Sequence, residues 1–256
     1  MTIYSIFFPS QHINCTLNFF NSKKMNNSAV FVIGPAGTGK TTFCKVMNDY
    51  YTSLKRKVCL FNLDPAAING AYHASITQKW DLNQVMDQYK LGPNGAMVKC
   101  LELCTDDPHW LEDQFSGISD ETLFIDCPGQ IELYTHEAEY MKKMSNILEK
   151  CGYKICIIYL VDSTYKNDEI KFNSALLNSL SANFQFQLPH LTVMTKMDIE
   201  PLESTINEGS NNNLLTRIKD LLYNYMHNEI IPFNYTETED LYIISAYIDR
   251  MLGQEN

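Results

Sequence analysis

Positive charge is scarce in this chain of 256 residues. It holds 20 Lys and Arg against 30 Asp and Glu, which gives a formal net charge of −10 at pH 7. Because phosphate neutralisation needs a surplus of Lys and Arg, this balance argues against direct nucleic-acid binding. Long apolar runs are also missing, since no stretch approaches the roughly 18 consecutive apolar residues of a membrane-spanning helix. We therefore expect a protein that does not cross a bilayer.

Cysteine pairs with a metal or redox spacing are absent as well. The eight cysteines are scattered through the sequence and none forms a CxxC pair. An even number leaves a disulfide framework open, but a chain of this length can fold without one, and several of the cysteines lie in apolar runs. Free and mostly buried thiols are therefore favoured. A zinc site is weaker still, because the six histidines fall at no ligand spacing relative to the cysteines.

The rest of the composition, 45% hydrophobic and 20% charged, is typical of a globular protein. Residues 1–28 are rich in Asn, Ser and Phe without a clear period, so we expect either a disordered extension or an over-long gene model that should begin near Met25. Residues 29–256 have the length of one domain. A flexible loop is expected near residues 201–213, where a glycine and three consecutive asparagines occur.

Apolar strand-like runs alternate with helix-length segments from residue 29 onwards. This alternation predicts an α/β fold with an open, mostly parallel sheet and helices on both faces. The expected strands are Ala29 to Ile33, Val58 to Leu63, Thr122 to Ile125, Ile155 to Val161, Leu191 to Met194 and Leu241 to Ile244. The expected helices span about residues 40–54, 134–149, 168–182 and 213–229. In the second helix, apolar residues at helical spacing predict a core-facing side rather than a partner-binding face.

The segment Gly34 to Thr41 matches the phosphate-binding pattern GxxxxGK[ST] and stands between the first expected strand and the first expected helix. Glycines allow successive backbone N–H groups to point at phosphate oxygens, and the start of the helix adds partial positive charge. Lys40 would reach the β and γ phosphates, and the Thr41 hydroxyl would bind Mg²⁺. The fold is thus predicted to be that of a P-loop NTPase. The expected phosphate-binding residues are Gly34, Gly37, Thr38, Gly39, Lys40, Thr41 and Thr42.

Two carboxylates follow expected strands. Asp126 opens a DxxG segment in which the carboxylate would hold Mg²⁺ and the Gly129 N–H would meet the γ phosphate. Gln130 and Glu132 come next and would orient the attacking water, although a solvated charge explains Glu132 nearly as well. Asp64 should face the same site, because the carboxyl ends of parallel strands line one crevice. The alternative for Asp64 is a turn or helix-capping role before a proline.

Thr195, Lys196, Met197 and Asp198 follow a strand and resemble the [NT]KxD guanine-specificity motif of GTPases. Two donors on the guanine edge match the two oxygens of one carboxylate, and the Lys196 stem would lie over the ring. Adenine would leave the carboxylate unpaired, at a cost of about 1–3 kcal/mol. Ser245 and Ala246, after the last expected strand, would supply a backbone contact to the guanine carbonyl oxygen.

Together with Gly92-Pro93-Asn94, these motifs make the chain resemble the GPN-loop GTPases, above all their third eukaryotic branch. The resemblance runs from about residue 29 to 252 and includes an unbroken block of eleven residues from Asp126 to His136. It implies a GPN-loop insertion at about residues 70–115, with GTP or GDP and Mg²⁺ as ligands. It also implies dimerisation through the nucleotide faces, with a paralogue or a second copy.

The resemblance further implies a role in RNA polymerase II assembly and nuclear import, with polymerase subunits as partners. The location that it implies is the cytoplasm with shuttling to the nucleus. Gly92 and Pro93 would then contact the nucleotide, and Asn94 would reach the phosphates of the neighbouring subunit. Without the resemblance, the tripeptide is typical of a plain turn.

Arginine is the rarest basic residue, and none of the three lies in a motif, so an arginine finger within the chain is not expected. Asn94 is a neutral donor that would act from outside instead. Family members usually have glutamate where this chain has Ile68, and the stretch from Asp64 to Gly92 is short. We therefore expect slow or partner-dependent GTP hydrolysis. Two alternatives stay open: a scaffold that binds GTP without hydrolysis, and a P-loop ATPase or kinase.

Overall fold

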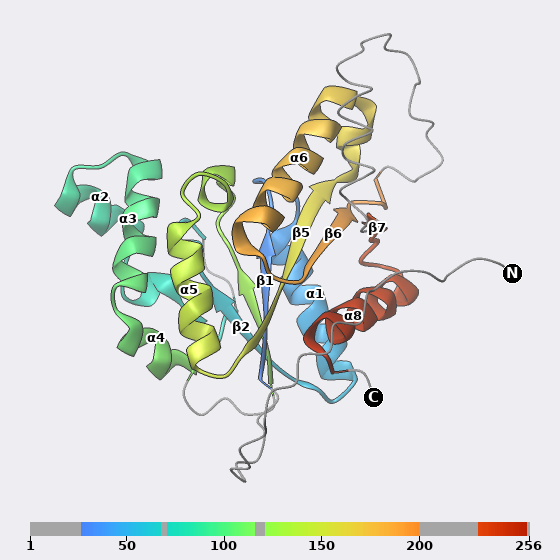
Figure 1. The fold of residues 1–256 in the computed structure, drawn as a ribbon, viewed down its shortest axis with the longest axis horizontal. Coiled ribbons are helices and arrows are strands. Elements are labelled where there is room, and N and C mark those ends of the chain that lie inside the picture. The colour runs from blue at the N-terminus through green and yellow to red at the C-terminus, as the bar shows by residue number, and fades with distance from the viewer. Residues whose placement is uncertain (1–26, 68–70, 116–120, 200–229, 255–256) are drawn as a thin grey trace, which may run out of the picture.

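The computed structural model describes residues 27–67, 71–115, 121–199 and 230–254 (Figure 1). Within them, seven parallel strands form one sheet in the order β3-β2-β4-β1-β5-β6-β7. This arrangement confirms the predicted α/β fold of a P-loop NTPase. The strands are β1 Ser28–Ile33, β2 Lys57–Asn62, β3 Ala74–Ser75, β4 Glu121–Asp126, β5 Lys154–Asp162, β6 His190–Thr195 and β7 Ile231–Pro232.

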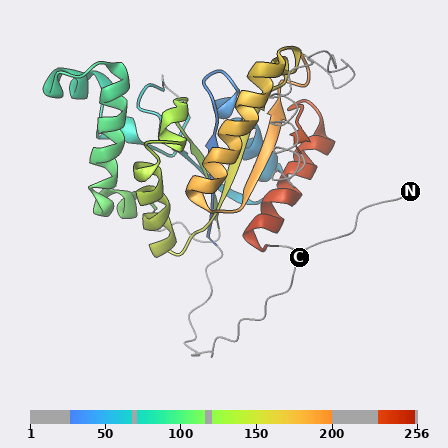
Figure 2. The ribbon, with the colours of Figure 1, turned by 45° about the horizontal axis from the view of Figure 1, so that its top comes forward.

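The central strands are buried on both faces, which explains why they appear in the sequence as continuous apolar runs rather than as alternating ones. All six residues of β1 are buried, and in β5 every residue except Lys154 is buried. Helices on both faces exclude water from the strands (Figure 2). The carboxyl ends of the parallel strands therefore become the edge where polar loops gather.

Two apolar cores lie on opposite faces of the sheet. One is covered by α1 (Lys40–Ser53) and α8 (Thr238–Leu252), and the other mainly by α5 (Glu139–Lys150) and α6 (Glu169–Phe186) (Figures 1 and 2). The apolar stripe predicted to face the core is confirmed, because all of its residues are buried. They are Ala138, Met141, Met144, Ile147 and Leu148. The second expected helix begins at Glu139 rather than 134, since Ile131–Tyr134 form a separate 3-10 turn.

A helical insertion stands at the β3 edge of the sheet, between β3 and β4 (Figure 1). It consists of α2 (Leu82–Tyr89), α3 (Pro93–Thr105) and α4 (Pro108–Phe115). The sequence placed an insertion here but no helices. Trp80 and Trp110 pack edge to face in it with ring centroids 4.8 Å apart. The insertion therefore has its own aromatic contacts as well as contacts with the main core.

The prediction of a strand at Leu241 to Ile244 is wrong, because these residues lie in α8. Apolar residues at helical spacing and acidic residues in the first turn favour a helix there. The last described strand is instead β7, which pairs with Val193 and Met194 of β6. The helix expected at 213–229, the loop near 201–213, the first 26 residues and Ile68 lie outside the described residues.

Two further features of the described residues, the state of the cysteines and the apolar character of the helices, can be compared with the expectations from the sequence. Seven cysteines are free there, and all of them except Cys151 are buried. Within the same part of the chain, none of the helices combines the length and apolar character that a bilayer crossing requires.

Candidate functional site

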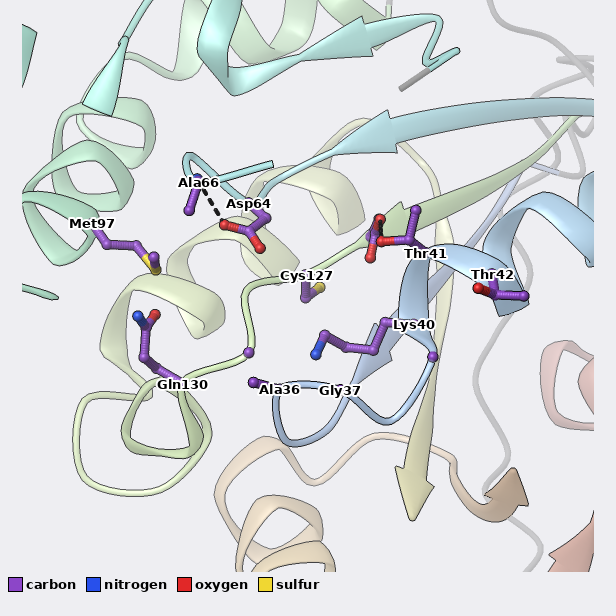
Figure 3. A pocket seen from close by; sticks show the side chains of 13 residues that line it. Ala36, Gly37, Lys40, Thr41, Thr42, Asp64, Ala66, Met97, Cys127 and Gln130 are labelled. Carbon is purple, nitrogen blue, oxygen red and sulfur yellow. Dashed lines mark hydrogen bonds between the residues drawn. The ribbon is translucent and has the colours of Figure 1, made fainter. Parts of the chain in front are cut away.

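The segment Gly34 to Gly39 forms a tight loop between β1 and α1 (Figure 3). Its three glycines have positive φ angles of 139° at Gly34, 81° at Gly37 and 89° at Gly39. A Cβ at Gly34 would stand 2.6 Å from the carbonyl oxygen of Leu160. Glycine is therefore required at Gly34 by space as well as by backbone conformation.

Lys40 lies at the first position of α1 and its side chain turns back over the loop. Its Nζ donates to the carbonyl oxygens of Gly34 at 2.9 Å and Pro35 at 3.0 Å. Burial lowers the pKa of Lys40, although the nearby carboxylate of Asp126 acts in the opposite direction. The ammonium group is thus held at the position where phosphate oxygens would replace two backbone carbonyls.

Thr41 and Asp126, the two residues expected to bind Mg²⁺, are in contact with each other. The Thr41 hydroxyl donates to Oδ2 of Asp126 at 2.7 Å, and Asp126 is buried at the end of β4. Hydroxyl and carboxylate oxygens suit Mg²⁺, which proteins often bind with few side chains and the phosphates of a nucleotide. No group of three His, Cys, Asp or Glu side chains suited to a metal occurs in the described part of the chain. The donors here therefore fit magnesium bound together with a phosphate.

Asp64 stands on the turn after β2 and is fixed by its neighbours. Its backbone N–H donates to Oδ1 of Asn62 at 3.0 Å, and its own Oδ1 accepts from the Ala66 N–H at 2.8 Å (Figure 3). Burial raises the pKa of Asp64, and the charge of Asp126 adds to the increase. Asp64 therefore stabilises a turn, which was the alternative interpretation of its sequence, and it also lines the same cavity as Lys40.

Gly129 and Gln130 complete the cavity. A Cβ at Gly129 would lie 3.0 Å from the Cα of Ala36, so the two loops touch there. The Oε1 atom of Gln130 is buried without a hydrogen-bond partner in the described structure. A buried acceptor of this kind costs free energy until a donor such as water reaches it.

These residues enclose a cavity of about 480 Å³ (Figure 3). Most of its walls come from the glycine loop, the start of α1 and the loops after β2 and β4. One wall is different, because Met97 comes from α3 of the insertion. The lining residues are Ala36, Gly37, Gly39, Lys40, Thr41, Thr42, Asp64, Ala66, Met97, Asp126, Cys127, Gly129 and Gln130.

Other candidate residues lie away from this lining. Glu132 is exposed on the 3-10 turn, which agrees with a solvated charge. Gly92, Pro93 and Asn94 are exposed and begin α3, with Gly92 as the N-cap. The tripeptide is therefore a helix start rather than a plain turn, and proline at N1 favours that.

The motif expected to bind the base begins at the end of β6. Thr195 is buried and donates from Oγ1 to the carbonyl oxygen of Thr38 at 2.8 Å, which ties the motif to the glycine loop. Lys196 donates to Oδ2 of Asp162 at 2.5 Å, and its backbone has φ 61°. Met197 and Asp198 form the following turn, where Asp198 is exposed. The motif lies beside the phosphate loop but does not line the cavity.

Asp162 was not a predicted site residue, yet it ends β5 next to this motif. Burial raises its pKa, but hydrogen bonds from Lys196 and Thr164 outweigh that effect, so the pKa of Asp162 lies below its usual range. The carboxylate therefore stays charged and holds the Lys196 ammonium in place.

Ser245 and Ala246 need a correction. They lie in the middle of α8, where Ser245 is buried, rather than in a loop after a strand. Backbone N–H groups inside a helix bond to the preceding turn, so the geometric premise of a base contact there is wrong. The loop that follows the last described strand begins at Phe233, and within it Oδ1 of Asn234 accepts hydrogen bonds from the N–H and Oγ1 of Thr236. The short apolar run before Phe233 is the sequence signal that could have located this strand and the loop after it.

Tyr72 was also missed. Its hydroxyl donates to Oδ2 of Asp126 at 2.6 Å, from a segment that no motif marks. Because the two residues are 54 positions apart in the chain, no sequence spacing could have linked them.

Comparison with known proteins gives one family. Residues 32–250 match a family model described as a conserved hypothetical ATP binding protein. GPN-loop GTPase 3 of Mycosarcoma maydis is 42% identical over 178 residues, which are 68% of this chain and 63% of that protein. GPN-loop GTPase 3 of Dictyostelium discoideum is 34% identical over 251 residues, or 89% of this chain and 88% of that protein.

A solved structure has the same fold. It is the crystal structure of a GTPase in apo form from Pyrococcus abyssi, with a TM-score of 0.73 over 89% of this chain and 98% of that chain. The sequence identity is 16%, so the likeness concerns the fold alone.

Proposed function

Since this chain belongs to the GPN-loop GTPase family, we propose that it binds GTP with Mg²⁺, hydrolyses GTP slowly and changes its association with a partner according to the bound nucleotide. The observation that carries this proposal is the pairing of Thr41 with Asp126 beside the glycine loop. The pairing places a hydroxyl and a carboxylate at the mouth of a phosphate cradle, and Gln130 lines the same cavity.

Phosphate binding would fall to the glycine loop and Lys40. The backbone of this loop is held in positive φ at three positions, so little reorganisation is needed when a ligand arrives. Lys40 is buried next to two carbonyl oxygens and would exchange them for phosphate oxygens, which make stronger charge-assisted hydrogen bonds. Thr41 and Asp126 would hold Mg²⁺, which supplies positive charge to the phosphate oxygens when bound.

The attacking water would be oriented by Gln130 and Asp64. Gln130 has a buried oxygen without a partner in the described structure, which suits a water O–H as donor. The pKa of Asp64 is raised by burial, which makes its carboxylate a better proton acceptor than an ordinary aspartate.

Guanine specificity rests on the segment after β6. Asp198 is exposed for pairing with the two guanine donors, while Asp162 holds Lys196 and Thr195 is bonded to the glycine loop. The matching family model has ATP binding in its description, so the base deserves a direct test. ATP should fail to displace labelled GTP at concentrations where GDP displaces it. Equal displacement by ATP would contradict guanine specificity and favour an ATPase or kinase.

A partner subunit is part of the proposal. Among the described residues, Arg56 makes two hydrogen bonds of 2.8 Å to Asp249, so it does not serve as an arginine finger within the chain. Asn94 is exposed at the start of α3, where another subunit could meet it. The proposed partner is a paralogous GPN-loop GTPase or a second copy, and RNA polymerase II assembly and import from the cytoplasm is the proposed process. Both follow from the family resemblance.

Single-turnover GTP hydrolysis tests the enzyme function. Gln130→Leu removes the group that orients water, so phosphate release should slow about 100-fold or more while GTP affinity stays near that of the wild type. Gln84→Leu, the same change at an exposed position of α2, is the control. No phosphate release by the wild type, alone or with a paralogue, would contradict hydrolysis and favour a GTP-bound scaffold.

Asn94→Ala tests the action of Asn94 on the neighbouring subunit. Hydrolysis by the dimer should slow about 10-fold, as expected for the loss of one donor, while nucleotide affinity stays nearly unchanged. A large loss of affinity in the monomer would contradict action across the dimer.

A further inference from the structure

Tyr72 contacts Asp126, whose carboxylate is proposed to hold Mg²⁺, from a segment that has no part in the function proposed above. It lies between β2 and β3, and its hydroxyl donates to Oδ2 of Asp126 at 2.6 Å. Thr41 donates to the same oxygen at 2.7 Å from the start of α1. One oxygen of a buried carboxylate is therefore held by two hydroxyl groups from two different segments.

The position of Tyr72 is fixed by the residues that follow it. The N–H of His73 donates to the carbonyl oxygen of Leu60 at 2.9 Å, and Nδ1 of His73 accepts from the Leu60 N–H, also at 2.9 Å. Next in the chain, Ala74 begins β3 and pairs with β2. The Tyr72 ring packs against the apolar core that α1 covers. Its hydroxyl is thus aimed at Asp126 from an anchored backbone.

We propose that Tyr72 is a positioning residue for the metal site, which holds the carboxylate of Asp126 against Thr41 in the orientation that receives magnesium. The proposal rests on the function proposed above. A carboxylate that is 2% exposed needs donors to offset the loss of water. Groups that orient metal ligands in this way typically change metal affinity 10- to 100-fold when they are removed.

The opposite role, in which the phenol competes with the metal, fits the contacts less well. Both hydroxyls use Oδ2, so neither of these two bonds occupies Oδ1 of Asp126. The Thr41 hydroxyl can donate its hydrogen to Asp126 while its oxygen lone pairs stay available for a cation. The two hydrogen bonds are therefore compatible with metal binding. The two roles predict opposite changes in magnesium demand.

The experiment measures release of fluorescently labelled GDP from Tyr72→Phe over a titration with Mg²⁺. Phe keeps the packed ring and removes only the hydroxyl. The Mg²⁺ concentration that gives half-maximal slowing of release should rise 10- to 100-fold. In EDTA, release should match the wild type. Tyr72→His keeps a ring with an N–H donor and should fall between the two.

Tyr50→Phe is the matched control. Tyr50 is a half-buried tyrosine on α1 that packs against the same apolar core, far along the helix from Lys40. Its variant should show the magnesium titration of the wild type.

Two results would overturn the role of Tyr72 alone. One is an unchanged titration for Tyr72→Phe, and the other is a lower magnesium demand, which would mean that the phenol competes with the metal. A wild type that retains no guanine nucleotide at any Mg²⁺ concentration would overturn the proposed function, and the role of Tyr72 with it.

Discussion

The loops that follow the strands on the two sides of β1 differ in how fully their polar groups are hydrogen-bonded within the protein. After β2 and β4, Gln130 has a buried oxygen with no partner in the described structure, and burial raises the pKa of Asp64. After β5 and β6, Lys196 is paired with Asp162, and Thr195 is bonded to the glycine loop. The first side keeps one buried oxygen, that of Gln130, for a ligand or water to satisfy, whereas Lys196 and Thr195 on the second side are already paired within the protein. Replacing one aspartate at a time with asparagine tests this difference.

Asp64→Asn should have the largest effect, and on rate rather than on affinity. Asparagine keeps an acceptor for the Ala66 N–H but cannot take a proton from water, so hydrolysis should slow about 100-fold or more. In the wild type, hydrolysis should fall as the pH falls through the raised pKa of Asp64, and the variant should lack this dependence. Single-turnover phosphate release over a pH series is the measurement.

The same variant should unfold at a higher urea concentration at neutral pH. A carboxyl group whose pKa is raised in the folded state destabilises the fold when it is charged, and asparagine removes that charge. The gain should vanish at a pH below the ordinary range of carboxyl pKa values. A variant that is less stable at neutral pH would contradict the contrast between the two sides.

Asp198→Asn should have an intermediate effect, and on affinity rather than on rate. Loss of two charge-assisted bonds to guanine should weaken GTP binding by about 1–3 kcal/mol, or 5- to 150-fold. The hydrolysis rate of bound GTP should stay near that of the wild type. Equilibrium titration with labelled GTP gives the affinity, and xanthosine triphosphate, whose edge matches asparagine, should regain part of it. A variant with unchanged affinity would remove Asp198 from the base site.

Asp162→Asn should have the smallest effect. It removes the ion pair with Lys196 but keeps an acceptor for Thr164, so the free energy of unfolding at pH 7 should fall by about 1 kcal/mol or less. Because the pKa of Asp162 is lowered in the fold, the wild type should lose this advantage as the pH falls through that pKa. Urea unfolding at pH 7 and pH 3 provides the comparison. A large loss of hydrolysis would show that the base side is not separate from the chemistry.

Local sequence patterns were enough to predict much of the fold and to find several residues of the candidate site. The glycine loop and Asp126 are marked by residue types at fixed spacing, and the central strands by continuous apolar runs. The α8 segment was mistaken for a strand because four of its residues, read alone, satisfy either period. The contact between Tyr72 and Asp126 depends on tertiary packing, so no local pattern contains it. Sequence therefore predicts the parts whose chemistry is written in consecutive residues.

The hydroxyl of Thr195 fixes the distance between the glycine loop and the segment that follows β6. It donates to the carbonyl oxygen of Thr38 at 2.8 Å and lies 3.2 Å from that of Val161, so it joins three strand-end segments at one point. The distance between the glycine loop and the turn at Met197 and Asp198 is therefore set by the protein itself. A nucleotide that binds as proposed must span this fixed distance with its sugar.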